Sequence, residues 1–354
     1  MLEREKLMRP LWETDAVYDE HLTMLLDGEG NARAPLLYKP TRILSVTDST
    51  GTIQYKEGLD WTLDGRELVL TQYSRIFAFP QEMLYPPQPI PNHTFPTRTG
   101  YALFFEGPFF HQHQIRVDYE CVNDWEGMRP RYAGALLPKT VAALREKLPL
   151  NLVLFGDSIS ARANATGDLD IPPYQPDYGV LLYDELLRFY GGDIRYFNPS
   201  VGGMESTWAV DTLAENVLPH SPGLLIVAFG MNDGAKTPER FSANIRRVIV
   251  NTRSAFPDCE FILVATTLPN PLLDDPRARF WGNQQYFGAA LDALAADASL
   301  GGGIAVADMT GLHRALLARK RFIDLTTNNV NHPNDFLYRF QAQLLARMLI
   351  PEEN

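Results

Sequence analysis

Residues 152–158, Leu-Val-Leu-Phe-Gly-Asp-Ser, are the stretch that decides the fold of this chain. The four apolar residues predict a short, buried strand of a parallel sheet. Gly156 allows a sharp turn after the strand, so Ser158 should lie at the rim of the sheet, where open α/β folds build their sites. Because a Gly-Asp-Ser triplet also suits an ordinary turn, the interpretation depends on the motifs further along the chain.

Three later stretches occur in a fixed order: Asn-Pro-Ser-Val-Gly-Gly at 198–203, Gly-Met-Asn-Asp at 230–233, and His-Pro at 332–333. Together with Gly-Asp-Ser they resemble the four sequence blocks of the SGNH (GDSL-type) hydrolase superfamily. The resemblance covers about residues 140–354. It implies a serine hydrolase that forms a covalent acyl-enzyme.

The resemblance assigns a role to each matching residue. Ser158 is implied as the nucleophile and His332 as its general base. The backbone N–H of Ser158, the backbone N–H of Gly203 and the side-chain amide of Asn232 are implied as donors to the oxyanion. Gly203 fits the donor position better than Gly202.

The chain departs from the family pattern three residues before the histidine, where the usual Asp is Asn329. An Asn oxygen can accept a hydrogen bond from the imidazole but supplies no negative charge. We therefore expect Asn329 or a backbone carbonyl to orient His332. Asp324 and Asp335 are alternatives, although Asp335 is better placed to cap the terminal helix. A further alternative is a pair of Ser158 and His332 with no clear third residue that orients the histidine.

The rest of the chain divides near residue 140. After it, apolar strands alternate with amphipathic helices, which predicts a parallel sheet covered on both faces in a flavodoxin-like, three-layer α/β domain. One helix is expected to begin at Thr237, with Pro238 in its first position. The expected strands are at about 152–156, 193–198, 223–229, 260–265 and 304–308.

The part before residue 140 carries β-type runs and turn residues. Alternation at 114–120 predicts a half-buried strand, and Asp-Gly at 64–65 predicts a hairpin. The proline-rich stretch 76–99 is expected to be a long loop. We expect a β-sandwich accessory domain over 1–139 and the catalytic domain over 140–354. This order is similar to that of some two-domain carbohydrate esterases.

The composition of the chain argues against some classes of binding partner. The 354 residues carry a net charge of −11, which argues against nucleic acid or an anionic membrane as a partner. Cys121 and Cys259 lie in different halves, so a disulfide framework is not expected. The start of the chain has no apolar leader and no run is long enough to span a membrane, which suggests a cytoplasmic protein.

Four further residues are candidates for binding. His111 and His113 would share one face of a strand, but no third ligand is evident, so surface histidines are expected and no metal or cofactor is predicted. Tyr174 and Trp208 could stack on a sugar ring, and ordinary packing is an equal alternative for both.

The sequence thus predicts a metal-independent serine esterase acting on a small acyl ester, namely an O-acetyl group on a carbohydrate. Two alternatives stay open. One is a lysophospholipase or thioesterase of the same superfamily, and the other is a non-catalytic carbohydrate-binding protein on a degenerate hydrolase scaffold. Composition says nothing of the oligomeric state.

Overall fold

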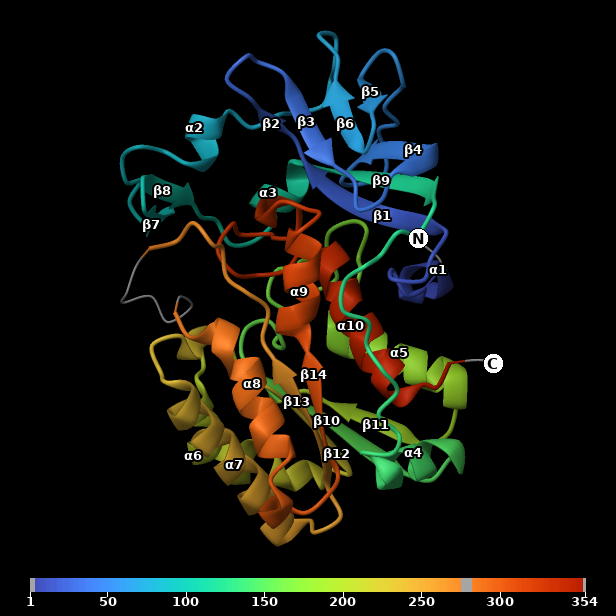
Figure 1. The fold of residues 1–354 in the computed structure, drawn as a ribbon, viewed down its shortest axis with the longest axis vertical. Helices are drawn as coiled ribbons and strands as arrows, with labels where there is room; N and C mark the ends of the chain where they lie inside the picture. The colour runs from blue at the N-terminus through green and yellow to red at the C-terminus, as the bar shows by residue number, and fades with distance from the viewer. Residues whose placement is uncertain (1–3, 275–281, 353–354) are drawn as a thin grey trace.

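The computed structural model describes residues 4–274 and 282–352. A five-stranded parallel sheet lies in the second half of the chain, with the strands in the order β11-β10-β12-β13-β14 (Figure 1). This is the flavodoxin-like order, so the predicted class of the catalytic part is confirmed. The strands are β10 (Leu150–Gly156), β11 (Ile194–Phe197), β12 (Leu224–Ala228), β13 (Glu260–Ala265) and β14 (Ile304–Asp308).

Helices cover both faces of this sheet because successive side chains of each strand point to opposite sides. Leu152 and Leu154 of β10 join one apolar cluster, whereas Val153 and Phe155 join another. The first cluster is closed by α4 (Pro138–Arg145), α5 (Tyr178–Tyr190), α9 (Met309–Leu317) and α10 (Asp335–Leu349). The second is closed by α6 (Ser206–Asn216), α7 (Pro238–Ala255) and α8 (Gln284–Ala295).

The first third of the chain is β-rich and antiparallel. One sheet has the order β1-β9-β4, a second β2-β3-β6-β5, and β7 pairs with β8. Side chains of the first two sheets share one apolar cluster. The strands are β1 (Ala16–Thr23), β2 (Leu25–Leu26), β3 (Ala32–Pro35), β4 (Pro40–Asp48), β5 (Trp61–Asp64), β6 (Glu67–Leu70), β7 (Thr94–Thr97), β8 (Gly100–Leu103) and β9 (Gln114–Cys121).

Several local predictions can be compared with these elements. The hairpin at 64–65 is confirmed, since Asp64 pairs with Glu67 across the turn between β5 and β6. Thr237 does cap α7, accepting a hydrogen bond from the backbone N–H of Arg240. The expectation of a plain loop over 76–99 was wrong. That stretch contains the short helix α2 (Gln81–Leu84) and strand β7.

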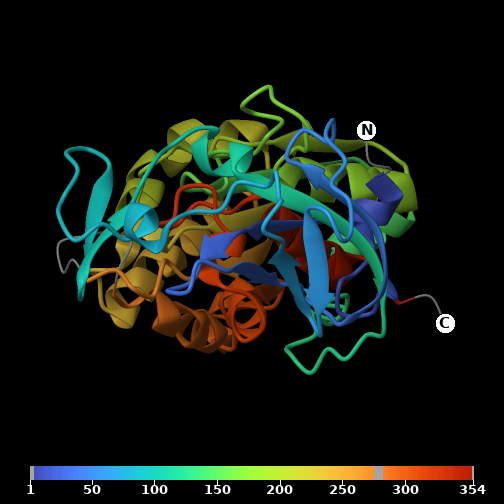
Figure 2. The same ribbon diagram turned by 90° about the horizontal axis from the view of Figure 1, so that it is seen from above.

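The two parts of the molecule pack directly on each other. The antiparallel strands lie above α9 and α10 in Figure 1, and from above they cover α10 (Figure 2). Apolar side chains from both parts form one cluster, to which β1, β9 and α10 contribute. The short N-terminal helix α1 (Arg4–Met8) also packs on α10 and β1. Within the described ranges, no helix combines the length and apolarity needed to cross a bilayer.

Candidate active site

Ser158 comes directly after the carboxyl end of β10, which is the strand where the sheet order reverses. The turn requires Gly156. A Cβ there would stand 2.3 Å from Ser160 Oγ and 2.5 Å from the carbonyl oxygen of Ala228, on the neighbouring strand. The packing between β10 and β12 thus explains why a glycine precedes the serine.

The expected pairing of Ser158 with His332 is present. Ser158 Oγ lies 3.0 Å from His332 Nε2. The histidine stands in the loop before α10. The Asn328 side-chain oxygen shapes this loop by accepting hydrogen bonds from the backbone N–H groups of Val330, Asn331 and His332, at 2.9–3.0 Å. The imidazole is therefore presented to the serine by a fixed backbone turn.

The other imidazole nitrogen contacts a residue that reasoning from the sequence missed. His332 Nδ1 lies 3.0 Å from Glu106 Oε2. Glu106 belongs to the β-rich part of the chain, in the connection between β8 and the short helix α3 (Phe109–Gln112). A carboxylate at Nδ1 fixes the tautomer in which Nε2 can accept the serine proton, and it stabilises the imidazolium that results.

Both oxygens of Glu106 are held by asparagine side chains. Asn164 Nδ2 donates to Oε2 at 2.6 Å, and Asn328 Nδ2 lies 3.3 Å from Oε1. Asn164 also accepts a hydrogen bond from the backbone N–H of Gly107 at 2.9 Å. Partial burial raises the pKa of the Glu106 carboxyl, but the hydrogen bonds and the charge of His332 outweigh it and hold this pKa below its usual range. The surroundings of Glu106 thus favour its charged form.

Asn329, which we expected to orient His332, makes no hydrogen bond to it. The backbone of Asn329 has φ +60°, and the turn sends its side chain away from the imidazole. Its Nδ2 donates to the carbonyl oxygen of Leu103 at 3.1 Å, and its Oδ1 accepts from Asn270 Nδ2 at 3.1 Å. Asn329 thus ties the histidine loop to β8.

Neither aspartate alternative contacts the imidazole. Asp324 is fully buried and pairs with Arg321 at 2.8 Å, while it accepts a hydrogen bond from the backbone N–H of Thr23. Asp335 accepts from the hydroxyl of Thr166 at 2.5 Å. The expected cap at Asp335 is corrected by one residue, because Asn334 is the N-cap of α10 and accepts from the backbone N–H of Leu337.

The candidate donors to the oxyanion, Gly203 and Asn232, follow β11 and β12, the two strands on either side of β10. A Cβ on Gly202 would come within 3.7 Å of Ser158 Cβ, so this turn lies against Ser158. Gly203 is the next residue, with φ +75°. Asn232 is nearly buried, and its Nδ2 donates to the carbonyl oxygen of Met204 at 3.1 Å. This contact links the second and third sequence blocks next to Ser158. The roles of Gly203 and Asn232 as donors stay predictions.

Asp157, between the turn glycine and the serine, is buried and accepts a hydrogen bond from the backbone N–H of Ile159 at 3.1 Å. Burial raises the pKa of its carboxyl to about 7, and the charge of Asp233 adds to the effect. Through its hydrogen bond with Ile159, Asp157 braces the turn beneath Ser158.

The two aromatic candidates lie in different surroundings. Trp208 is in α6 and packs against Phe155 and Phe229, with ring centroids 5.4 Å and 6.3 Å apart. It is therefore part of the packing between α6 and the sheet. Tyr174 is 55% exposed and lines a cavity between its loop and the β1-β9-β4 sheet.

His111 and His113 stand in α3 and at its end, not on a strand. His111 Nε2 lies 2.9 Å from the carbonyl oxygen of Pro172, and His113 Nδ1 lies 2.7 Å from that of Phe109. Among the residues that the structure describes, no group of three or more His, Cys, Asp or Glu side chains is arranged to hold a metal ion.

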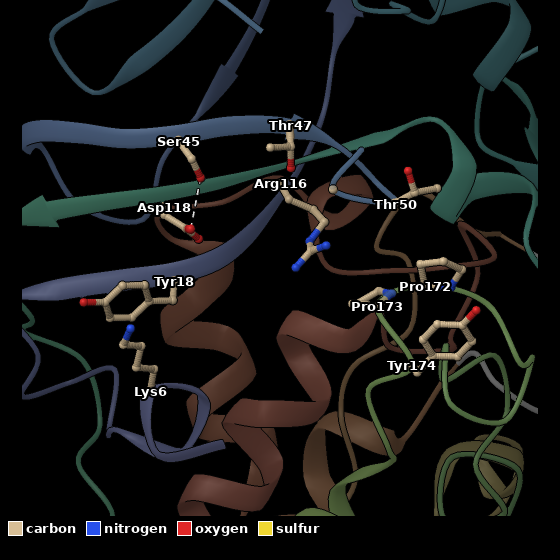
Figure 3. A pocket seen from close by; sticks show the side chains of 11 residues that line it. Lys6, Tyr18, Ser45, Thr47, Thr50, Arg116, Asp118, Pro172, Pro173 and Tyr174 are labelled. Atoms are coloured by element: carbon tan, nitrogen blue, oxygen red, sulfur yellow. Dashed lines mark hydrogen bonds between the residues drawn. The ribbon is translucent and has the colours of Figure 1, made fainter. Parts of the chain in front are cut away.

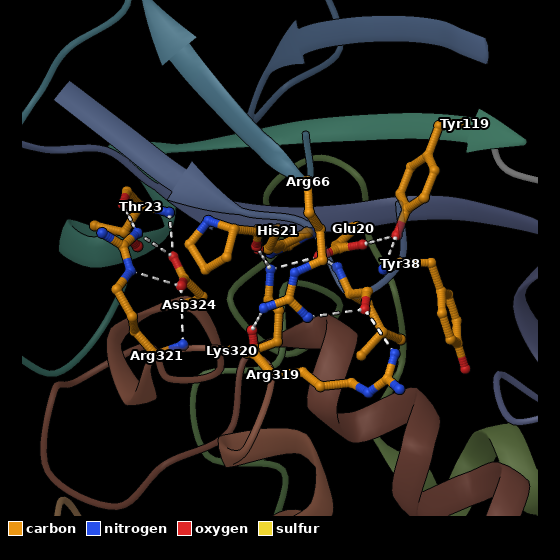
Figure 4. A network of polar contacts seen from close by, with 12 residues as sticks. Glu20, His21, Thr23, Tyr38, Arg66, Tyr119, Arg319, Lys320, Arg321 and Asp324 are labelled. Carbon is orange, nitrogen blue, oxygen red and sulfur yellow. Dashed lines mark hydrogen bonds and ion pairs between the residues drawn. The ribbon is translucent and has the colours of Figure 1, made fainter. Parts of the chain in front are cut away.

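Buried charges fasten the segment before the histidine loop to β1 (Figure 4). The fully buried Lys320 pairs with the fully buried Glu20, which also accepts from Tyr119 Oη at 2.6 Å. One residue further on, Arg321 donates to the backbone oxygens of Thr23 and Arg33. The parts that supply Glu106 and His332 are therefore joined by a buried ion pair, and loss of either partner would leave the other charge buried and unpaired.

No local pattern marks Glu106 in the sequence. It is separated from His332 by 226 residues and lies in a Phe-Phe-Glu-Gly-Pro stretch that matches none of the four blocks. The only hint in the sequence is the absence of the family aspartate at position 329, where the chain has Asn329. A carboxylate that orients His332 must therefore lie at another position. Glu106 is not among the carboxylates that lie near His332 in the sequence.

A parallel sheet covered on both faces, with a serine just after its first strand and a histidine in contact with that serine, is an arrangement found in hydrolases of the α/β class. The GDSL-like lipase/acylhydrolase family model matches residues 154–340, more than half of the chain, and the chain belongs to that family. The match begins within β10 and ends within α10, so it includes Ser158, Asn232 and His332 but not Glu106.

Solved structures with a similar fold share little sequence. A two-domain esterase, CEX, active on acetylated mannans, is 18% identical, with a TM-score of 0.49 over 64% of this chain and 55% of that one. A catalytic mutant of Axe2, an acetylxylan esterase from Geobacillus stearothermophilus, is 17% identical, with a TM-score of 0.45 over 57% and 96%. The chain thus matches only about half the length of the two-domain esterase. A search of curated protein sequences found no match.

Proposed function

We propose that the protein is a serine esterase in which Ser158, His332 and Glu106 act together. The observation that carries the proposal is the continuous line of contacts from Ser158 Oγ to His332 Nε2 and from His332 Nδ1 to Glu106 Oε2, each at 3.0 Å. A serine is weakly nucleophilic unless a base accepts its proton, and a base of this kind is more effective when a carboxylate stabilises its charged form.

In the proposed reaction, Ser158 Oγ attacks the ester carbonyl carbon while its proton moves to His332 Nε2. The carbonyl oxygen becomes an oxyanion, for which the backbone N–H groups of Ser158 and Gly203 and the amide of Asn232 are the proposed donors. The carbon–oxygen bond of the alcohol then breaks, and His332 returns the proton to that alcohol. Water, deprotonated by His332, releases the acyl group from Ser158.

For the substrate, we propose a small acyl group, such as acetyl, on a carbohydrate. The side chains around the imidazole are polar, since Asn164 and Asn328 hold Glu106 and Asn331 lies beside the histidine. These amides are engaged within the protein, but they leave no continuous apolar wall at this side of the histidine, which the acyl chain of a lipid would need.

The test is a series of nitrophenyl esters of increasing acyl length, together with an acetylated oligosaccharide. We expect kcat/KM to fall sharply beyond butyrate, and Ser158→Ala to lose turnover by roughly 10⁴ to 10⁶ while keeping the fold. Activity that rises with chain length would favour the lysophospholipase or thioesterase alternative. Ser158→Ala protein with more than about a tenth of wild-type turnover would reject the assignment of the nucleophile.

A further inference from the structure

A second site candidate lies between the β1-β9-β4 sheet and the loop after Ser158 (Figure 3). It is a cavity of about 650 Å³. This is within the range of roughly 300–1,000 Å³ typical of small-molecule pockets. Its wall combines two tyrosines, three hydroxyl side chains and one guanidinium: Tyr18, Tyr174, Ser45, Thr47, Thr50 and Arg116.

Arg116 is the most informative residue of this wall. Its side chain is only 12% exposed, and its Nε pairs with the fully buried Asp19 behind it. The outer nitrogens of the guanidinium point into the cavity (Figure 3), and within the described part of the chain Asp19 is the only hydrogen-bond acceptor recorded for this group. An arginine fixed from behind in this way presents a planar fork suited to a carboxylate or phosphate.

The wall also holds one carboxylate, Asp118, which keeps its negative charge but directs its oxygens at groups other than Arg116. Asp118 Oδ1 accepts from the backbone N–H of Asp19 at 2.6 Å, and Oδ2 accepts from Ser45 Oγ at 3.0 Å. Across the cavity, the ammonium of Lys6 lies 5.4 Å from the centre of the Tyr18 ring. The cavity is therefore lined by two cationic groups and one carboxylate, in a chain with a net charge of −11.

The remaining wall suits a sugar ring. Tyr174 is 55% exposed, so its ring has a face available for stacking, and the hydroxyls of Thr47 and Thr50 lie opposite (Figure 3). Aromatic faces and hydroxyls are the groups that pack on and hydrogen-bond to polyhydroxylated rings. We propose that this cavity binds a carboxylate-bearing saccharide, with the carboxylate on Arg116 and a sugar ring against Tyr174.

The cavity wall is connected to the candidate active site. The loop that supplies Tyr174 begins at Ser158 and includes Asn164, which holds Glu106. The carbonyl oxygen of Pro172, in the same wall, lies 2.9 Å from His111 Nε2 in α3, the helix that comes after Glu106. A saccharide in the cavity therefore contacts the loop that positions the catalytic groups, although its binding needs no ester.

The proposal is tested by calorimetric titration of the full-length Ser158→Ala protein with tri-galacturonate. The neutral trisaccharide of the same linkage, in which each carboxylate is a hydroxymethyl group, is the matched ligand. We expect saturable binding of the acidic form, which weakens as salt is added, and at least about tenfold weaker binding of the neutral form. No saturable binding, or equal affinity for the two ligands, would overturn the proposal.

Two variants in the Ser158→Ala background locate the site. Tyr174→Ala should weaken binding of tri-galacturonate about tenfold, because the stacking face is lost. Tyr73→Ala removes a tyrosine that is 68% exposed outside the cavity and should leave the affinity unchanged. Equal effects of the two variants would contradict the assignment to this cavity. Since the ligand carries no ester, these results are independent of whether the wild-type protein has esterase activity.

Discussion

The imidazole of His332 is held at both nitrogens by groups from different parts of the molecule. Ser158 comes from the end of the first parallel strand, and Glu106 comes from the β-rich part. Asn164 adds a second link, since its one side chain binds both the carboxylate of Glu106 and the backbone of Gly107. We infer that Asn164 is a positioning residue that keeps Glu106 directed at the histidine.

The variant Asn164→Gly tests this inference. Asn164 has φ +63°, a conformation that glycine adopts without strain, so the variant removes the amide and spares the backbone. We expect kcat to fall about tenfold or more, with a smaller change in KM, because the lost amide positions Glu106 and also lies 3.3 Å from His332 Nδ1. The matched control is Asn92→Gly, at an exposed position with φ +64°. A normal kcat in Asn164→Gly would remove the positioning role.

The turn after β10 depends on the spacing between neighbouring strands. Gly156 stands where any side chain would meet Ser160 and the backbone of β12. This contact explains at the level of packing why the strand ends in Gly-Asp-Ser, and why the sequence pattern predicted the strand and the position of the serine correctly.

Gly156→Ala should therefore lower the free energy of unfolding by about 1–3 kcal/mol or more, since the nearest obstacle includes a backbone oxygen that cannot turn aside. Gly302→Ala is the control, because a Cβ there meets nothing within 4 Å. Denaturant unfolding of both variants provides the comparison. Equal free energies of unfolding for the two variants would show that β10 and β12 can accommodate a side chain at position 156 without loss of stability.

The two halves of the molecule are joined by buried charge as well as by apolar packing. Lys320 and Glu20 are both fully buried, and their ion pair links the segment before the histidine loop to β1. Removal of one partner would leave the other charge buried without compensation, which is more damaging than the loss of an exposed pair.

Lys320→Met should destabilise the protein by about 3–5 kcal/mol. The control is Lys139→Met, because Lys139 and Asp258 form an exposed ion pair whose loss should cost less than about 1 kcal/mol. Thermal unfolding in the two variants measures the difference. If Lys320→Met unfolds like the wild type, the buried pair does not hold the two halves together.

The sequence predicted the parallel sheet, its order of elements and the pairing of Ser158 with His332, because each rests on local periodicity or on a short motif. Glu106 could not be found in this way, since it reaches the histidine through the packing of one part on the other. The expectation at Asn329 was wrong for a local reason: the left-handed backbone turns its side chain toward Leu103 and Asn270.

The dependence of kcat/KM on pH in Glu106→Gln, beside Asn329→Ala, tests the central claim most directly. The pKa of Glu106 is held below its usual range, so the wild-type charge persists through the acidic limb of the profile. Glutamine removes that charge and no longer stabilises the imidazolium, so kcat/KM should fall by roughly 10² to 10⁴ and the acidic limb should move to lower pH. Asn329→Ala strains a left-handed backbone position and removes the tie to β8, so its rate can fall, but its acidic limb should stay that of the wild type. A Glu106→Gln enzyme with the wild-type rate and profile would contradict the account.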